Sequence, residues 1–237
     1  MCGIVGYTGK QSVAKQILDA LELLEYRGYD SAGMAIVDET NGQVQIRKRA
    51  GRVADLEKVW KANPVNGICG IGHTRWATHG GVSDVNAHPH RAGRVTLVHN
   101  GIIENYEELK DHFGLADELI SDTDSEVVAA VLNRFYTGDP HEALFQTVKC
   151  LKGTFALVVI FDDIPNVIFA IRNVSPIVAA YREDGTMLAS DVAALGGQAT
   201  SYMVVPEYHV VELHTDDIRV YNMKNELCEA EFLDIDW

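Results

Sequence analysis

The second residue of the chain is a cysteine, and removal of Met1 would expose it as the N-terminal residue. Cys2 would then carry both a thiol and a free α-amine. A thiol with a pKa of ~8.5 is a strong nucleophile once it is deprotonated, and an α-amine with a pKa of ~7.7–8.0 can accept that proton near neutral pH. Such a residue is a nucleophile with its own general base. For a Met-Cys start considered alone, the alternative is a buried cysteine on a first strand.

Three further groups have residue types that could serve the same chemistry. Asn100-Gly101 follows an apolar run and, considered alone, is a typical turn dipeptide. Arg75 also follows an apolar run, where it is either a solvated strand end or a guanidinium fork suited to a carboxylate. Asp124 stands in the first turn of an expected helix, where an acidic residue favours the helix dipole. Residues 76–93 are rich in His, Gly, Asn and Ser, and a loop of that length is usually functional.

The remaining histidines and cysteines give weaker signals. His88-Pro89-His90 superficially resembles a metal-binding pair, but two histidines without a carboxylate or cysteine partner are weak evidence, so we expect no metal. The other cysteines form no CxxC pair and lie in apolar surroundings, which predicts packing residues: Cys69, Cys150 and Cys228. This cysteine usage suits a reducing cytosol.

The elements that must position these residues are apolar strands and amphipathic helices. Strands are expected over residues 2–7, 32–37, 44–48, 68–74, 95–98, 154–162, 167–172, 176–181, 186–190, 202–205, 208–213 and 218–221. Helices are expected over 12–26, 53–62 and 105–113, after the capping box Thr123-Asp124-Ser125-Glu126, and from Asp139-Pro140 to near Gly153. Asn41-Gly42 predicts a hairpin. The pattern predicts an α+β fold of stacked antiparallel sheets with helices outside, and the acidic end, 234–237, resembles a linker.

Composition limits the class of protein. The chain has 237 residues, 47% of them apolar and 23% charged, which allows one domain over 1–237 with a sizeable core. A net charge of −14 argues against nucleic acid or an anionic membrane as the partner. No apolar run approaches the ~20 residues of a membrane span. The first residues also lack the basic segment of a signal peptide, so we expect a cytoplasmic protein.

Six segments occur in one order along the chain: MCGIVG, YRGYDSAG, HTRWATHG, NAHPH, VHNGIIEN and SDTDSE. Over essentially the whole chain they resemble the N-terminal glutaminase domain of the glucosamine-6-phosphate synthases (glutamine–fructose-6-phosphate aminotransferases), which are class II amidotransferases with an N-terminal nucleophile. Purine-pathway relatives look like HRGQ and RYST at the second and third segments. Asparagine and glutamate synthases share the Cys-Gly-Ile start but lack the Trp-Ala-Thr-His-Gly run. The resemblance implies a four-layer αββα sandwich.

The resemblance also assigns roles to residues at matching positions. The Asn100 side chain and the Gly101 backbone N–H would form the oxyanion hole, which amide hydrolysis needs because charge develops on the former carbonyl oxygen. Arg75 would bind the α-carboxylate of glutamine, and Asp124 would receive its α-ammonium. This zwitterion clamp would distinguish free glutamine from a peptide.

Four more residues take supporting roles by the same resemblance. Thr78 and His79 would line the glutamine pocket, with His79 as a wall rather than a base because the α-amine already fills that role. Trp76 would be the lid that shields ammonia from solvent, and Arg27 would support the nucleophile. No cofactor is expected.

The implied activity is hydrolysis of L-glutamine to glutamate and ammonia through a Cys2 thioester. In the complete family enzymes, a C-terminal sugar-isomerase half uses the ammonia to convert fructose 6-phosphate into glucosamine 6-phosphate, and a homo-oligomer would assemble through that half, which lies outside these residues. Two alternatives remain open: a related amidotransferase domain that serves another acceptor, and a non-catalytic module that binds glutamine for regulation. The second would be expected to have lost Cys2 or Asn100.

Overall fold

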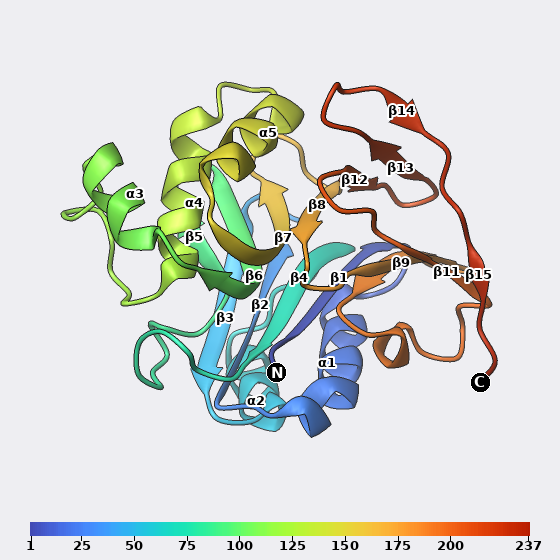
Figure 1. Ribbon diagram of the computed structural model, residues 1–237. Coiled ribbons are helices and arrows are strands. Elements are labelled where there is room, and N and C mark those ends of the chain that lie inside the picture. The colour runs from blue at the N-terminus through green and yellow to red at the C-terminus, as the bar shows by residue number, and fades with distance from the viewer.

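The computed structural model describes residues 1–237 as two stacked antiparallel sheets between layers of helices (Figure 1). The helices are α1 (Val13–Leu24), α2 (Val53–Ala62), α3 (Tyr106–Phe113), α4 (Asp124–Phe135) and α5 (Pro140–Cys150). The eight-stranded sheet contains, in spatial order, β15 (Leu233–Asp234), β11 (Ser201–Val204), β9 (Val178–Arg182), β10 (Gly185–Ala189), β1 (Gly3–Gly9), β4 (Cys69–Arg75), β2 (Ser31–Val37) and β3 (Val44–Ala50). The seven-stranded sheet contains β14 (Leu227–Cys228), β13 (Ile218–Tyr221), β12 (Val210–Leu213), β8 (Ile168–Asn173), β7 (Gly153–Phe161), β6 (Val95–Ile103) and β5 (His90–Ala92).

The alternation of side chains along the strands builds three hydrophobic layers. In β7, Phe155 and Leu157 pack in the layer under α3, α4 and α5, whereas Ala156 and Val158 face the other sheet. A third layer joins the eight-stranded sheet to α1 and α2. Strands that are buried on both faces read as continuous apolar runs, and this is how most of them are recognisable in the sequence. The four-layer αββα sandwich is confirmed.

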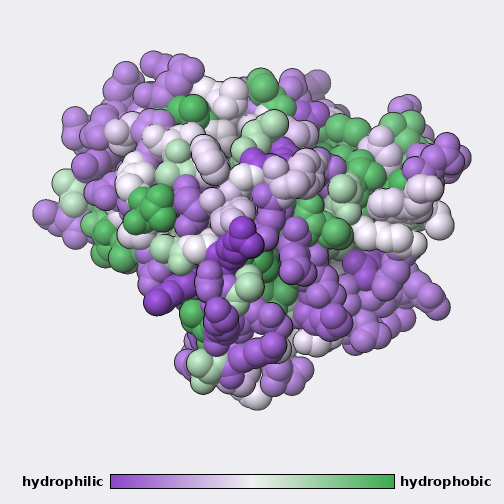
Figure 2. Space-filling model, turned by 90° about the horizontal axis from the view of Figure 1, so that it is seen from below, coloured by the Kyte–Doolittle hydropathy of each residue, from purple (hydrophilic) through white to green (hydrophobic).

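The helices cover opposite outer faces of the sandwich. In Figure 1, α1 and α2 lie below the sheets, α4 and α5 lie above them, and α3 lies to the left beside α4. Figure 2 views the molecule from below and shows mainly hydrophilic residues, with apolar residues in small separate groups. None of the helices combines the length and the apolar character that crossing a membrane requires.

Most expected elements are confirmed, including the hairpin of β2 and β3 around Asn41-Gly42. The first helix is shorter than expected, because it ends at Leu24 and continues as a 3-10 turn, η1 (Glu25–Arg27). The last helix ends at Cys150 rather than near Gly153, because Gly153, with φ of 120°, already begins β7.

Two local expectations were only partly right. The 76–93 segment is mostly loop but contains β5, whose three residues pair with β6. At the start of α4, Thr123 accepts a hydrogen bond from the Glu126 N–H at 3.2 Å, as a capping residue does. The Glu126 carboxylate, however, accepts from the N–H groups of Ile120 and Ser121 instead of completing a capping box.

The acidic end of the chain packs against the eight-stranded sheet. β15 pairs with β11, the N–H of Ile235 donates to the Thr200 carbonyl at 2.9 Å, and the indole N–H of Trp237 donates to the Ala199 carbonyl at 2.9 Å. The interpretation of residues 234–237 as a linker is therefore wrong. The three cysteines other than Cys2 pack in or against the hydrophobic layers, as expected: Cys69, Cys150 and Cys228.

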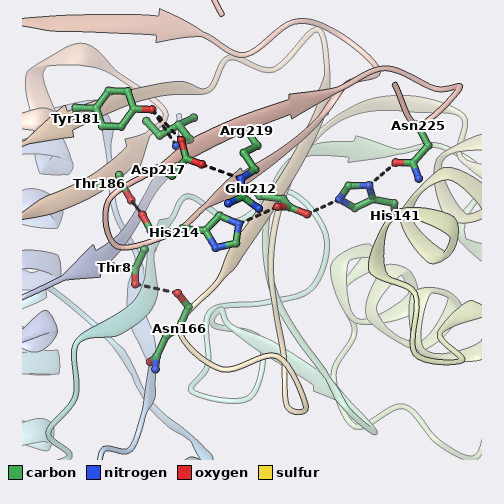
Figure 3. A network of polar contacts seen from close by, with 11 residues as sticks. Thr8, His141, Asn166, Tyr181, Thr186, Glu212, His214, Asp217, Arg219 and Asn225 are labelled. Carbon is green, nitrogen blue, oxygen red and sulfur yellow. Dashed lines mark hydrogen bonds and ion pairs between the residues drawn. The ribbon is translucent and has the colours of Figure 1, made fainter. Parts of the chain in front are cut away.

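A polar network joins α5 to the edge of the seven-stranded sheet (Figure 3). The Glu212 carboxylate lies 2.7 Å from His141 Nε2 and 2.8 Å from His214 Nε2, and His141 Nδ1 faces the Asn225 side-chain oxygen. Burial lowers the pKa of His141, but its hydrogen bonds to Glu212 and Asn225 outweigh burial and raise it. Only the protonated ring has two N–H donors for these two oxygens.

Candidate active site

Cys2 directly precedes β1, a central strand of the eight-stranded sheet. Its thiol is held by the backbone of Trp76, whose N–H donates to Sγ at 3.2 Å and whose carbonyl accepts from Sγ at 3.5 Å. Burial raises the pKa of the Cys2 thiol, although the Trp76 N–H and the Arg75 charge oppose that effect. The thiol is therefore protonated at neutral pH, and a base must remove its proton before it can attack.

Asn100 reaches Cys2 from the opposite sheet. It lies on β6, is 8% exposed, and its side-chain NH₂ donates to the Cys2 carbonyl at 3.1 Å. Gly101 follows with φ of 121°, and a methyl group there would come within 2.1 Å of the Thr154 carbonyl oxygen. Glycine is therefore required next to Asn100, since other residues disfavour this backbone conformation and would also clash.

Two adjoining spaces meet at the thiol. The outer one has a volume of about 370 Å³ and is lined by Met1, Cys2, Arg27, Trp76, Thr78, Asn100, Gly101, Ile102, Thr154, Ser175 and Pro176. The inner one is much smaller and is lined by Cys2, Arg75, Trp76, Thr78, His79, His88, His99, Gly101, Thr123, Asp124 and Ser125. The structure thus gathers every residue that the sequence suggested for catalysis, binding or support around one cysteine.

Arg75 is 3% exposed and lies at the end of β4. Its guanidinium donates to the carbonyls of His79, Gly80 and Gly81, so it fixes the loop that contains Trp76. A guanidinium has five N–H donors, and these three contacts leave donors for a carboxylate. Arg75 can therefore hold the loop and bind an anionic group at once.

Asp124 is the first residue of α4 and is 4% exposed. One carboxylate oxygen accepts the Ile103 N–H at 2.8 Å, while the other has only a 3.5 Å contact with the Ser125 hydroxyl. A buried carboxylate with a weakly engaged oxygen suits an ammonium group. The His79 ring forms the neighbouring wall and packs edge-on against Tyr106 at 5.3 Å.

Trp76 and Arg27 lie at the outer space. The Trp76 side chain is 54% exposed and lines both spaces, which is compatible with a lid. Arg27 donates to the Ser190 carbonyl at 3.3 Å and to the Asp191 carboxylate at 3.2 Å. Its own carbonyl accepts the Met1 ammonium at 2.6 Å, so Arg27 lies in contact with the N-terminal residue.

Two supporting residues were not identified in the sequence. Asp30 accepts the Ala77 N–H through its carboxylate, and its backbone N–H donates to the Arg75 carbonyl at 2.7 Å. Lys48 donates to three carbonyls between Val85 and Pro89 at 2.9–3.2 Å, and burial lowers its pKa to about 8. The position of Asp30 within the YRGYDSAG segment could have indicated its role near the site, whereas nothing in the sequence around Lys48 indicates its role.

The histidines around the 88–90 segment form a buried cluster behind the site. His88 stacks on His73 with ring centroids 4.0 Å apart, and His90 packs edge-on against His88 at 4.7 Å. His88 Nδ1 accepts the His99 N–H at 3.2 Å, and His90 Nε2 lies 3.1 Å from the Thr123 hydroxyl. These two histidines of the apparent metal pair therefore make packing and hydrogen-bonding contacts within the protein.

The αββα sandwich with a cysteine at the start of a central strand defines the N-terminal-nucleophile type of hydrolase fold. The chain belongs to the glutamine amidotransferase family, since residues 43–236 match its model, described as a glutamine amidotransferase domain. It is a class II domain, homologous to the glutaminase half of glutamine–fructose-6-phosphate aminotransferases.

Curated relatives support this assignment over the full chain. The glutamine–fructose-6-phosphate aminotransferase (isomerizing) of Clostridium acetobutylicum is 39% identical over 100% of this chain and 39% of its own length. The proteins of that name from Streptomyces coelicolor and Bacillus subtilis are 43% and 42% identical, over 100% and 96% of this chain and 39% and 38% of their own lengths. The chain therefore spans about two fifths of the length of the relatives that it matches.

Solved structures support the fold. The glutamine phosphoribosylpyrophosphate amidotransferase of B. subtilis, complexed with ADP and GMP, superposes with a TM-score of 0.81 at 20% identity, covering 95% of this chain and 50% of that one. A glutamine aminotransferase class-II domain protein from Silicibacter pomeroyi gives a TM-score of 0.63 at 16% identity, covering 93% of this chain and 99% of that one.

Proposed function

We propose that this chain hydrolyses L-glutamine to L-glutamate and ammonia through a thioester on Cys2. The observation that carries the proposal is the convergence of two hydrogen-bond donors on Cys2. The Trp76 N–H lies 3.2 Å from Sγ, and the Asn100 side-chain NH₂, from the opposite sheet, lies 3.1 Å from the Cys2 carbonyl oxygen. A nucleophile beside fixed hydrogen-bond donors is what acyl transfer requires.

In the first half-reaction, the α-amine that removal of Met1 exposes takes the thiol proton, directly or through one water. The thiolate attacks the glutamine δ-carbonyl, and the new oxyanion is stabilised by the Asn100 side chain and the Gly101 N–H. The amine returns the proton to the leaving nitrogen, so that the C–N bond breaks and ammonia departs. The thioester and a neutral amine remain.

In the second half-reaction, the same amine removes a proton from water. The hydroxide attacks the γ-glutamyl thioester, the oxyanion forms again in the same place, and the C–S bond breaks. The thiolate takes up the proton that the amine received, and glutamate is released. The same donors serve both halves because the oxygen occupies the same position in each.

The substrate specificity is proposed to come from Arg75 and Asp124. Both side chains are buried in the inner space next to Thr78 and His79, and they offer opposite charges for an α-carboxylate and an α-ammonium. A peptide lacks at least one of these groups and would leave one buried charge unpaired, which costs about 2–5 kcal/mol. We therefore expect activity on free glutamine and little on glutaminyl peptides.

The nucleophile is tested by Cys2→Ala. We expect this variant to release no ammonia from glutamine while its circular dichroism spectrum stays unchanged, and an electrophilic ketone analogue of glutamine should alkylate the wild type only at Cys2. Cys150→Ala is the matched control, because Cys150 is a partly buried thiol at the end of α5, and it should retain full activity. Normal turnover by Cys2→Ala would reject the assignment.

We further propose that, in a longer protein, the ammonia is transferred to fructose 6-phosphate to give glucosamine 6-phosphate. The support is the activity for which the relatives are named, and these relatives extend well beyond the aligned region. The present chain alone should then release glutamate and ammonia yet form no amino sugar from glutamine and fructose 6-phosphate, as measured by mass spectrometry. Detection of glucosamine 6-phosphate would contradict this division of labour.

A further inference from the structure

His73 lies fully buried between the two sheets. It is on β4, where its partners are Ile4 on β1 and Gly33 on β2, and it shares its face of the strand with Ile71. An apolar side chain would fill such a position more easily, because a buried polar group must be compensated by hydrogen bonds. The contacts of this ring therefore need an explanation.

The ring makes its hydrogen bonds through one nitrogen only. Nε2 lies 2.9 Å from the Asn100 side-chain oxygen and 3.1 Å from the His99 carbonyl oxygen. Both partners are acceptors, so Nε2 carries the hydrogen. Nδ1 is buried without a partner, so the neutral ring with its only N–H at Nε2 is the form that fits. Burial lowers the pKa of His73 to about 3, which agrees with a neutral ring.

The plane of the His73 ring is fixed by its neighbour. His88 stacks on it at an interplanar angle of 12°, and His88 is itself held by the His99 N–H. The direction in which His73 donates is thus determined by packing on one side and by the His99 carbonyl on the other.

This donor decides the orientation of the Asn100 carboxamide. With the observed orientation, the oxygen accepts from His73 and the NH₂ donates to the Cys2 carbonyl at 3.1 Å. Rotation of the amide by 180° would place NH₂ against the His73 N–H and oxygen against the Cys2 carbonyl, which makes two repulsive contacts out of two hydrogen bonds.

We propose that His73 is a positioning residue, which keeps the Asn100 NH₂ directed toward Cys2, where the substrate carbonyl would react, by donating from a neutral Nε2–H to the Asn100 oxygen. The inference rests on the proposed glutaminase function. A misoriented Asn100 would present an oxygen to the developing oxyanion, so loss of His73 should affect the transition state rather than the binding of glutamine.

The kinetic test compares His73→Leu, which removes the donor, with His73→Gln, which can return an N–H near Nε2. We expect His73→Leu to lower kcat by about 10- to 100-fold, below or at the range for loss of a whole oxyanion donor, with KM changed less than about twofold. The kcat of His73→Gln should be at least about tenfold higher than that of His73→Leu. His141→Gln, a buried histidine on α5 remote from the site, is the control and should keep the wild-type kcat.

A second measurement distinguishes a misoriented Asn100 amide from general damage to the site. The γ-aldehyde analogue of glutamine forms a thiohemiacetal with Cys2, whose oxygen occupies the oxyanion position. Its affinity should fall in His73→Leu by the same factor as kcat, whereas the affinity for glutamate should stay constant. Equal losses for aldehyde and glutamate, or equal kcat values for the Leu and Gln variants, would overturn the proposal.

A spectrum of the wild type decides the matter even if the Leu variant does not fold. Long-range ¹H–¹⁵N correlation of the imidazole should show His73 as the Nε2–H form from pH 5 to 8. A ring protonated at Nδ1, or a charged ring in that range, would refute the inference. Absence of glutaminase activity in the wild type would instead reject the proposed function, and the spectrum would still decide the tautomer.

Discussion

Retention of Met1 should inactivate the enzyme, and the structure shows why. With Met1 attached, the nitrogen of Cys2 is a peptide amide, and the free amine belongs to Met1, where it donates to the Arg27 carbonyl at 2.6 Å. The Met1 side chain also lines the outer space next to the thiol. The only free amine near the site is therefore one residue away from the position where a base is needed.

The size of the effect follows from the displacement of the amine and from the contribution that a general base makes to the rate. Consecutive Cα atoms are ~3.8 Å apart, and a misplacement of ~1 Å can already cost about 10²-fold in rate. A positioned general base contributes about 10²- to 10⁴-fold. Since burial raises the pKa of the Cys2 thiol, the thiol is mostly protonated at pH 7.5 without a base. We expect the Met1-bearing form to be slower by about 10²- to 10⁴-fold.

The assay compares two forms that differ only in Met1, prepared with and without methionine aminopeptidase and verified by intact mass. Ammonia release is measured from pH 6 to 9. The processed form should show an acid limb in kcat/KM near the α-amine pKa of ~7.7–8.0, and the Met1-bearing form should stay about 10²- to 10⁴-fold slower at its best. Equal rates for both forms would eliminate the α-amine as the base and direct attention to a side chain such as His79.

Three further outcomes are expected. Arg75→Ala and Asp124→Ala should each weaken glutamine binding by about 2–5 kcal/mol, as measured by KM and calorimetry, and an unchanged affinity would place the clamp elsewhere. Gly101→Ala should lower kcat by at least about 10²-fold, because its methyl would meet a carbonyl oxygen of β7 at 2.1 Å; wild-type kcat would exclude this backbone from the oxyanion hole. His141→Gln should lower the free energy of unfolding by about 1.5–3 kcal/mol near pH 6. Because the pKa of His141 is raised in the folded protein, its contribution to stability is complete below its ordinary pKa and is lost as pH rises through the raised pKa. Because the pKa of Glu212 is lowered in the folded protein, its contribution is complete above its ordinary pKa and is lost as pH falls through the lowered pKa. Urea unfolding at pH 6 and pH 9 should therefore show a smaller difference at pH 9, and a constant difference would refute the linkage.

The architecture was largely predictable because its strands and helices carry strong periodic signals. The apolar run at 154–162 is β7 almost to the residue, and its alternation explains how one strand contributes to two hydrophobic layers. β5, β14 and β15 were not predictable, since two or three residues carry no period. Each of them is stabilised by a partner strand in the sheet, so their existence depends on the assembled fold.

The site was predictable only through its motifs. Hydrophobic pattern alone does not bring Asn100 to Cys2, because they are 98 residues apart and lie on different sheets. His73 reads as an ordinary member of an apolar strand, and Asp30 as a loop residue after a helix. Their roles depend on which backbone and side-chain groups face them in the folded chain, which local sequence does not specify.

Cys2 and Asn100, the proposed nucleophile and oxyanion donor, lie on different sheets, and this has a consequence for how the protein tolerates mutation. Ile4, two residues from Cys2, and Val98, two residues from Asn100, pack in the layer between the sheets. A change of volume there alters the spacing of the sheets and with it the distance between thiol and amide, where ~1 Å matters greatly. The two outer layers carry no such constraint. Selection should therefore allow volume-conserving substitutions of the apolar residues under the helices, while the residues of the layer between the sheets stay nearly unchanged. This difference should hold even where substitutions in the two places lower the free energy of unfolding equally.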